Sequence, residues 1–221
     1  MWAAQGILAA LYERQGTGVG RLVECSLPET AIGFSSWTSA QWLADHEEPT
    51  RQGSRHRQNA PYQRMKTKDG YLMVGAAGEA IWVRCAAALG RPEWCEDPRF
   101  ATNEQRMQNR TALEAEMEAV LTTATSDHWV EVLKAAGVPC GPVYNYAQMF
   151  ADSQVRHRGL IQYASDPDLG EVPHIRTPIK IADGVRVRTV APKLGQHNAE
   201  IFGRLGMSEA EIKKLRAKGV V

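Results

Sequence analysis

The first twelve residues, Met1 to Tyr12, read MWAAQGILAALY and are apolar on every face of a helical wheel. A helix with this pattern is buried on all sides, whereas a surface helix carries a single apolar stripe. The stretch has no basic leader and runs into Glu13 and Arg14 without a cleavage site, which argues against a signal peptide. Because the apolar pattern starts at the first residue, with no polar N-cap ahead of it, we expect a core helix whose earlier neighbours lie upstream of Met1.

A glycine-rich turn follows this helix and leads into the strand-like run Leu22–Ser26. A second helix is expected to open at Pro28 and to reach about Ala44. The order helix, turn, strand, helix predicts an α/β body with a largely parallel sheet. The glycines from Gly16 to Gly20 come after a helix and before a strand. That is the reverse of a dinucleotide-binding loop, and it favours a helix cap and turn.

The middle of the chain predicts a small α+β unit. The segment Asp45–Ala60 is polar and irregular, and two strand-like runs follow at Tyr62–Thr67 and Gly70–Gly75. Asp69 followed by Gly70 is typical of a hairpin turn. Periodicity then predicts helices at Ile81–Leu89, Asn109–Ala124 and Ser126–Ala136, the last closed by Gly137.

The last part of the chain, from Val138, is rich in loops. Short extended runs are expected at Leu160–Ala164 and Ile179–Ile181, and two helices close the chain. The final helix begins with a capping box formed by Ser208 and Glu211.

Charge and composition exclude several classes of function. The formal net charge of +1 gives no reason to expect nucleic acid or a membrane surface as a partner. No run approaches the ~20 apolar residues that span a bilayer. The six histidines and four cysteines show no metal-ligand spacing, so no metal site is expected. Cysteines without a disulfide framework predict a cytoplasmic protein with reduced thiols at Cys25, Cys85, Cys95 and Cys140.

A few polar groups are candidates for chemistry. Glu29 lies at a strand-to-helix junction and Glu79 at the hairpin-to-helix junction, where side chains often point into clefts. For both, a carboxylate stabilised by the start of a helix is the alternative. His128, at the start of a helix, is interpreted as a surface or capping residue. The basic residues after the second helix form either an anion site or a solvated face: Arg51, Arg55, His56, Arg57, Arg64, Lys66 and Lys68.

Several blocks of the sequence resemble family III coenzyme A transferases, in the order in which they occur there. The first is GILAALYERQGTGVGRLVECSLPE, from Gly6 to Glu29. Further blocks are NAPYQRMKTKDGYLMVG (59–75), LGRPEWCEDPRFATNEQRMQNR (89–110), AAGVPCGPVYN (135–145) and APKLGQHNAEIFGRLG (191–206). The resemblance covers nearly the whole chain.

The resemblance implies an α/β fold, with a partial large Rossmann-like domain built from both chain ends and an inserted small α+β domain. The expected segments are 1–45 and 138–221 for the large domain and 46–137 for the small one. It also implies two interlocked copies as a homodimer, and acyl-CoA and a carboxylic acid as substrates. Coenzyme A, bound as acyl-CoA, is expected to contact Leu27, Arg57, Asn59 and Tyr62.

In the family an aspartate shortly before the first block attacks the acyl-CoA thioester and forms covalent intermediates. This resemblance places the nucleophile upstream of Met1, so no catalytic residue is expected in this chain beyond the candidates Glu79 and Glu29. The stretch from Arg51 to Tyr62 lacks the tetraglycine loop of formyl-CoA transferases. Two alternatives stay open: a non-catalytic or dimerising CoA-binding module, and a relative of α-methylacyl-CoA racemase, in which Glu79 would transfer a proton.

Overall fold

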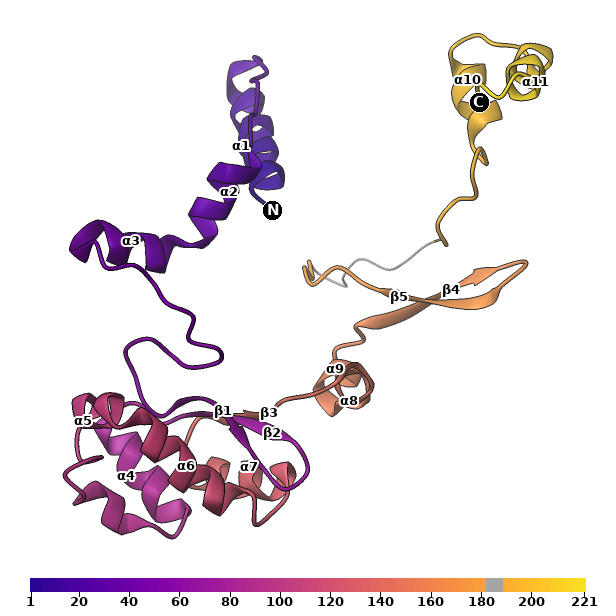
Figure 1. Cartoon of the computed structure of the whole chain (residues 1–221). Coiled ribbons are helices and arrows are strands. Elements are labelled where there is room, and N and C mark those ends of the chain that lie inside the picture. The colour runs from indigo at the N-terminus through magenta and orange to yellow at the C-terminus, as the bar shows by residue number, and fades with distance from the viewer. Residues whose placement is uncertain (182–188) are drawn as a thin grey trace. The chain divides into compact units, whose positions relative to one another are not determined.

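The fold is known from a computed structural model that describes residues 1–181 and 189–221. Helices and two small antiparallel sheets make up the described residues, so the chain is of the mixed α/β class (Figure 1). The chain divides into two compact units, Met1–Pro142 and Val143–Val221. The Rossmann-like character of a large domain and the three-segment division at 45 and 137 stay predictions.

Three helices form the N-terminal segment: α1 (Trp2–Thr17), α2 (Leu27–Phe34) and α3 (Ser36–Asp45). The helix α1 ends at Gly18, whose φ of 72° is the left-handed conformation that glycine adopts without strain. Pro28 lies in the first turn of α2, and the Oγ atom of Ser26 accepts a hydrogen bond from the Glu29 N–H at 3.3 Å. The first helix was predicted, and the single helix expected from Pro28 to about Ala44 is divided into α2 and α3.

The expectation that the first helix is a core helix with neighbours upstream of Met1 stays a prediction, and within the described chain α1 has no buried residue. Leu8 is 66% exposed and Tyr12 is 80% exposed. A helix that is apolar on every face needs neighbours on every side. The contacts described for α1 include Phe34 of α2, whose ring centroid lies 6.0 Å from that of Trp2, Val23, and Arg21, which forms an ion pair with Glu13 at 2.9 Å.

The predicted strand at Leu22–Ser26 is also not observed. This run is irregular between α1 and α2, and no described strand pairs with it. A strand is stabilised by backbone hydrogen bonds to a neighbour, and the side-chain pattern alone does not supply one.

The predicted hairpin is confirmed. The strands β1 (Tyr62–Lys66) and β2 (Tyr71–Gly75) pair antiparallel, with Tyr62 opposite Gly75 and Lys66 opposite Tyr71. A third strand, β3 (Cys140–Pro142), pairs antiparallel with β2 and lies beyond Gly137, where the small domain was expected to end.

Helices cover one face of this sheet (Figure 1). They are α4 (Glu79–Ala88), α5 (Asn103–Gln108), α6 (Arg110–Leu121) and α7 (Ser126–Ala135), with the 3₁₀ turn η1 (Pro92–Cys95). Alternate strand residues point into this layer, as the period of two requires. The core includes these inward side chains of both layers: Met65, Leu72, Val74, Trp82, Cys85, Trp94, Phe100, Leu113, Met117, Leu121 and Leu133.

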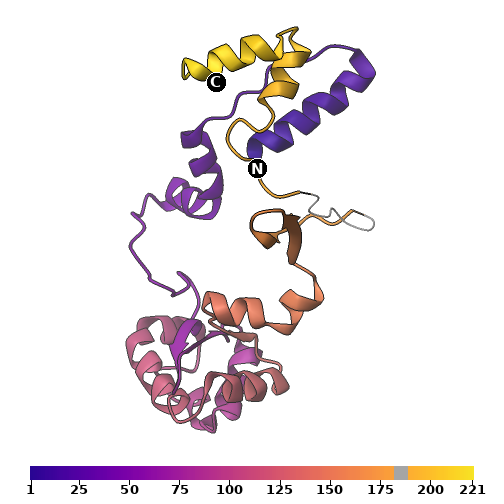
Figure 2. The same cartoon turned by 90° about the vertical axis from the view of Figure 1, so that its right-hand side faces the viewer.

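The second unit contains two short helices, a hairpin and a terminal helix pair. The elements are α8 (Tyr146–Ala151), α9 (Ser153–His157), β4 (Ile161–Asp166), β5 (Gly170–Ile175), α10 (Asn198–Arg204) and α11 (Glu209–Ala217). Figure 2 shows α10 and α11 folded against each other. The capping box of Ser208 and Glu211 is present, as predicted. The extended run at Leu160–Ala164 lies largely in β4, but Ile179–Ile181 forms no strand.

Candidate functional site

The loop that leads into β1, together with the first residue of β1, carries three of the four residues predicted to contact coenzyme A. The imidazole of His56 stacks on the ring of Tyr62, with centroids 5.1 Å apart and planes 4° apart. The backbone N–H of His56 donates to the Tyr62 carbonyl at 2.9 Å. The Asn59 amide Nδ2 lies 3.2 Å from the His56 Nδ1, and the Arg57 guanidinium donates to the Thr50 carbonyl at 3.4 Å. Asn59 and Tyr62 thus both contact His56, whereas the contact described for Arg57 is with Thr50.

Leu27, the fourth predicted contact, is the first residue of α2 in the N-terminal helical segment and is 87% exposed. The catalytic candidate Glu29 lies in the first turn of the same helix, where its carboxylate accepts a hydrogen bond from the Ser26 hydroxyl. This arrangement is the helix-start carboxylate that the sequence offered as the alternative to catalysis.

A hollow of about 450 Å³ opens beside the Tyr62 ring. Gly75 lies opposite Tyr62 in the sheet, and a Cβ atom at Gly75 would stand 3.5 Å from the Tyr62 ring. The absence of a side chain at Gly75 thus leaves space next to the ring. The lining is mainly apolar and also includes Met73, Ile81, Pro139 and Cys140.

Glu79 begins α4 and forms an ion pair with Arg106, whose Nη1 lies 2.9 Å from Glu79 Oε2. The Glu79 Oε1 also accepts a hydrogen bond from the Asn103 N–H at 2.8 Å. Partial burial works against ionisation, but the hydrogen bonds from Arg106 and Asn103 outweigh it and hold the pKa of Glu79 below its ordinary value. Glu79 is therefore an ionised partner of a buried cation, and its proton-transfer role stays a prediction.

Arg106 and Asn103 were not singled out from the sequence. The Arg106 side chain is 0% exposed and lies over the ring of Trp82, 5.0 Å from its centroid. Its guanidinium donates to the carbonyls of Ala60, Ala77 and Phe100. The sequence signal was indirect, because both residues lie in the family-like block 89–110 but show no recognisable spacing.

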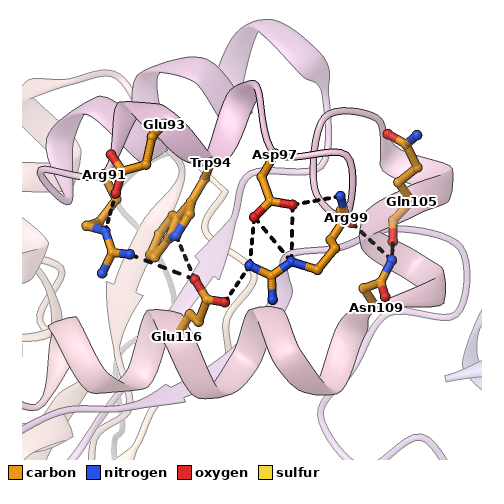
Figure 3. A network of polar contacts seen from close by, with 8 residues as sticks. All are labelled: Arg91, Glu93, Trp94, Asp97, Arg99, Gln105, Asn109 and Glu116. Atoms are coloured by element: carbon orange, nitrogen blue, oxygen red, sulfur yellow. Dashed lines mark hydrogen bonds and ion pairs between the residues drawn. The ribbon is translucent and has the colours of Figure 1, made fainter.

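A second set of charged residues forms a network of hydrogen bonds and ion pairs around Glu116 (Figure 3). Glu116 of α6 accepts a hydrogen bond from the Trp94 indole at 2.9 Å and forms an ion pair with Arg99 at 3.0 Å. Arg99 also pairs with Asp97 at 2.6 Å, and Arg91 reaches Glu116 at 3.9 Å. This network ties η1 and the loop after it to α6.

The basic group separates into paired and unpaired members. Arg55 forms an ion pair with Glu114, whereas Arg57, Arg64 and Lys66 have no carboxylate partner among the described residues. The guanidinium of Arg64 lies over the Tyr71 ring, 4.1 Å from its centroid. An anion that met this face would thus find cations not already neutralised by the protein.

The histidines, cysteines and carboxylates form no group of three or more potential metal ligands in residues 1–181 and 189–221. The four cysteines are free thiols. Cys85 is buried in the core, and burial raises the pKa of its thiol to about 12. His128 is exposed at the start of α7, consistent with a surface residue. Within the same described ranges no helix has the length and apolar character needed to span a bilayer.

Residues 1–198 match the family described as CoA-transferase family III, and the chain belongs to this family. The match covers all five sequence blocks apart from the end of the last one. The resemblance deduced from those blocks is thereby confirmed.

Individual relatives agree with this assignment. The chain is 30% identical to the succinyl-CoA:glutarate CoA-transferase of Mus musculus over 227 residues, covering 100% of this chain and 51% of that protein. It is 34% identical to an acyl-CoA transferase of Fusarium pseudograminearum, covering 97% of this chain and 48% of that protein. The crystal structure of a CaiB/BaiF family protein from Brucella suis superposes with a TM-score of 0.76 at 33% identity, over 90% of this chain and 51% of that one. The chain spans about half the length of the relatives it matches.

Proposed function

We propose that this chain is part of an enzyme that moves coenzyme A from an acyl-CoA to a carboxylic acid. The single observation that carries the proposal is the family match over residues 1–198. The relatives named after succinyl-CoA:glutarate and formyl-CoA:oxalate transfer suggest the reaction type. Acyl-CoA and a carboxylic acid are then the substrates, and coenzyme A is carried between them.

The loop of residues 56–62 is the proposed coenzyme A contact within this chain. Arg57 supplies a guanidinium without a carboxylate partner among the described residues, suited to phosphate. Asn59 supplies an amide, and the Tyr62 ring forms one wall of the apolar hollow. Coenzyme A combines phosphates with a flexible amide-containing arm, so a site with these three kinds of group fits it chemically. Leu27 is proposed as a fourth contact.

The chemical step is proposed to use an aspartate supplied by a segment ahead of Met1. A carboxylate that attacks the thioester carbonyl releases the thiolate of coenzyme A and becomes part of a mixed anhydride. The thiolate attacks the aspartyl carbonyl of this anhydride, which releases the donor acid and leaves coenzyme A bound as an aspartyl thioester. The acceptor carboxylate attacks that thioester and forms a second anhydride, and the released thiolate attacks the acceptor's carbonyl, which forms the new acyl-CoA and frees the aspartate. Glu29 and Glu79 are not needed for this scheme, because both carboxylates are engaged in contacts within the protein.

A homodimer in the cytoplasm is part of the same proposal. The N-terminal helices expose large apolar side chains, including Trp2 at 47% and Trp37 at 61%. Large exposed apolar surfaces are typical of protein–protein interfaces. Light scattering at micromolar concentration is expected to show a dimer, and a compact monomer would contradict it.

The experiment is a transfer assay with matched tyrosine variants. The purified protein is incubated with several acyl-CoA donors and carboxylate acceptors, and new acyl-CoA is quantified by chromatography. Binding of coenzyme A is measured by calorimetry for the unsubstituted protein, Tyr62→Ala and Tyr71→Ala. Both tyrosines lie on the same sheet face and are similarly exposed, at 45% and 39%.

We expect Tyr62→Ala to weaken coenzyme A binding about tenfold, equivalent to about 1.4 kcal/mol, and Tyr71→Ala to leave it within twofold. Failure of the unsubstituted protein to bind coenzyme A or any acyl-CoA would overturn the proposal. Binding without transfer is the result expected of this chain, because the aspartate is proposed to lie ahead of Met1, and transfer by this chain alone would overturn that placement of the nucleophile.

A further inference from the structure

The backbone of residues 58–60 is held mainly by side chains from α5 and α6. Asn103 accepts a hydrogen bond from the Ala60 N–H through Oδ1 at 3.1 Å and donates from Nδ2 to the Gln58 carbonyl at 2.9 Å. Arg106 donates to the Ala60 carbonyl at 2.7 Å, and Arg110 donates to the Asn59 carbonyl at 3.0 Å. The loop thus depends on α5 and α6 for its conformation, not on a strand or helix of its own.

We call Asn103 and Arg106 the clamp. Both residues form hydrogen bonds with the Glu79 carboxylate, which fixes their positions. One carboxylate oxygen of Glu79 pairs with Arg106 at 2.9 Å, and the other accepts the Asn103 N–H at 2.8 Å. The Arg106 side chain is fully buried, so its alternative rotamers are excluded by packing. The residues that hold the backbone of the loop are therefore themselves held in one conformation.

The clamp contacts only the main chain of the loop. The bonds from Asn103 and Arg106 end on backbone atoms of Gln58 and Ala60, whereas Arg57, Asn59 and Tyr62 extend their side chains from the same short segment. Fixing the main chain orders the three side chains before a ligand arrives, which lowers the entropy cost of binding.

We propose that Asn103 and Arg106 are positioning residues for coenzyme A, because they hold the loop that presents Arg57, Asn59 and Tyr62. This inference rests on the proposed function, and it assigns to the clamp a role in affinity for the thioester substrate. Asn103 is the better position for a test, because its side chain is half-buried and its substitution leaves the Arg106–Glu79 pair in place.

The experiment compares Asn103→Ala with Asn109→Ala. Asn109 lies at the other end of the same helix, is also half-buried, and donates to the carbonyls of Arg99 and Gln105, away from the loop (Figure 3). Coenzyme A affinity is measured by calorimetry, thermal unfolding by circular dichroism, and loop order by hydrogen exchange of the Ala60 amide. Where the protein turns over, KM for acyl-CoA and kcat are measured separately.

We expect Asn103→Ala to raise the Kd for coenzyme A about tenfold, to raise KM with little change in kcat, and to speed exchange at Ala60. Both variants are expected to lower the unfolding temperature by similar amounts. The Kd of Asn109→Ala for coenzyme A is expected to stay within twofold of the unsubstituted value. Equal loss of affinity in both variants, or an unchanged Kd for Asn103→Ala, would overturn the inference while the proposed function stood. An unsubstituted protein that binds no coenzyme A would overturn both, and hydrogen exchange would then show whether the clamp orders the loop for another purpose.

Discussion

The region from Ala60 to Val138 buries most of its large apolar side chains, whereas the two flanking regions leave most of theirs exposed. In the described residues, the buried hydrophobic side chains all lie between Ala60 and Val138 except Ala164 and Ile212. The flanking regions hold comparable apolar residues, such as Leu8 and Trp37, but expose them. Composition is thus not what separates the regions. The middle region contains both layers of its own core, and the described flanks do not.

The largest difference expected between the middle region and the flanking regions is in the reactivity of their cysteines. Cys25 is exposed in the N-terminal region, whereas Cys85 is buried in the core and has a pKa raised to about 12 by burial. A thiol reagent at pH 8 is expected to label Cys25 at least about 10³-fold faster, because Cys85 reacts only after the core opens and a domain opens at a cost of about 5 kcal/mol or more. Mass spectrometry of digested, timed samples measures both rates.

Comparable labelling rates at the two cysteines would show that the middle region lacks a stable core. Cys25→Ser serves as the control, since it removes the fast site and leaves the slow one. Denaturant should then bring Cys85 to the rate of a free thiol.

The second test concerns two arginines of the middle region. Arg106→Met leaves the carbonyls of Ala60, Ala77 and Phe100 without their donor, and each unsatisfied buried group costs about 1–3 kcal/mol. A loss of about 3–5 kcal/mol is expected. Arg99→Met removes ion pairs of a side chain that is 46% exposed and is expected to cost no more than about 1 kcal/mol. Urea unfolding measures both, and similar losses would contradict the structural role given to Arg106.

The origin of these contacts explains what the sequence predicted and what it missed. The hairpin was predictable because Asp69 and Gly70 encode the turn locally, and the capping box at Ser208 and Glu211 is equally local. The role of Arg106 depends on carbonyls up to 46 residues away, and no local spacing reports where those carbonyls fold. The prediction of a strand at Leu22–Ser26 was wrong because the alternation of side chains is a local pattern, whereas a strand also needs a neighbouring strand to pair with, and no described strand pairs with this run.

The candidate site shows the same division. The resemblance pointed to Arg57, Asn59 and Tyr62, and the structure places Arg57 and Asn59 in the loop before β1 and Tyr62 at the first position of β1. Asn103 and Arg106, which hold this loop, were not predicted, because their hydrogen bonds to the loop end on main-chain atoms. Side-chain type indicates what a residue is able to bind, but not which backbone group it meets.

The third test uses the same substitution in both regions. Leu113→Ala removes a side chain that is 1% exposed in the core and is expected to destabilise the protein by about 2–4 kcal/mol. Leu8→Ala removes one that is 66% exposed on α1 and is expected to change stability by less than about 0.5 kcal/mol. Unfolding of both variants, followed by circular dichroism at a fixed protein concentration, measures the difference. A large loss for Leu8→Ala would mean that α1 is covered in solution by a second copy, and it should then shrink on dilution.

The smallest expected effect is the dependence of stability on pH through Glu79. Its folded-state pKa is lowered, since the hydrogen bonds from Arg106 and Asn103 outweigh the opposing effect of burial. A carboxyl with a lowered pKa contributes stability above its unfolded-state pKa of about 4.3, and this contribution is lost as the pH falls through the folded-state pKa. The carboxylate is 56% exposed, so solvent screening limits the contribution to about 1 kcal/mol or less.

Glu79→Gln is therefore expected to destabilise the protein at pH 7, and the difference from the unsubstituted protein is expected to shrink as the pH falls and the Glu79 carboxylate becomes protonated. Urea midpoints measured from pH 3 to pH 7 give the difference. Glu104→Gln is the control, because Glu104 is an exposed carboxylate of α5 that forms no ion pair among the described residues. A difference that stays constant across this pH range would mean that Glu79 holds Arg106 through hydrogen bonds that glutamine reproduces poorly at any pH, and not through its charge. The loop of residues 56–62 would then depend on the geometry of the carboxylate more than on its ionisation, and acidification should leave coenzyme A affinity unchanged until the fold itself is lost.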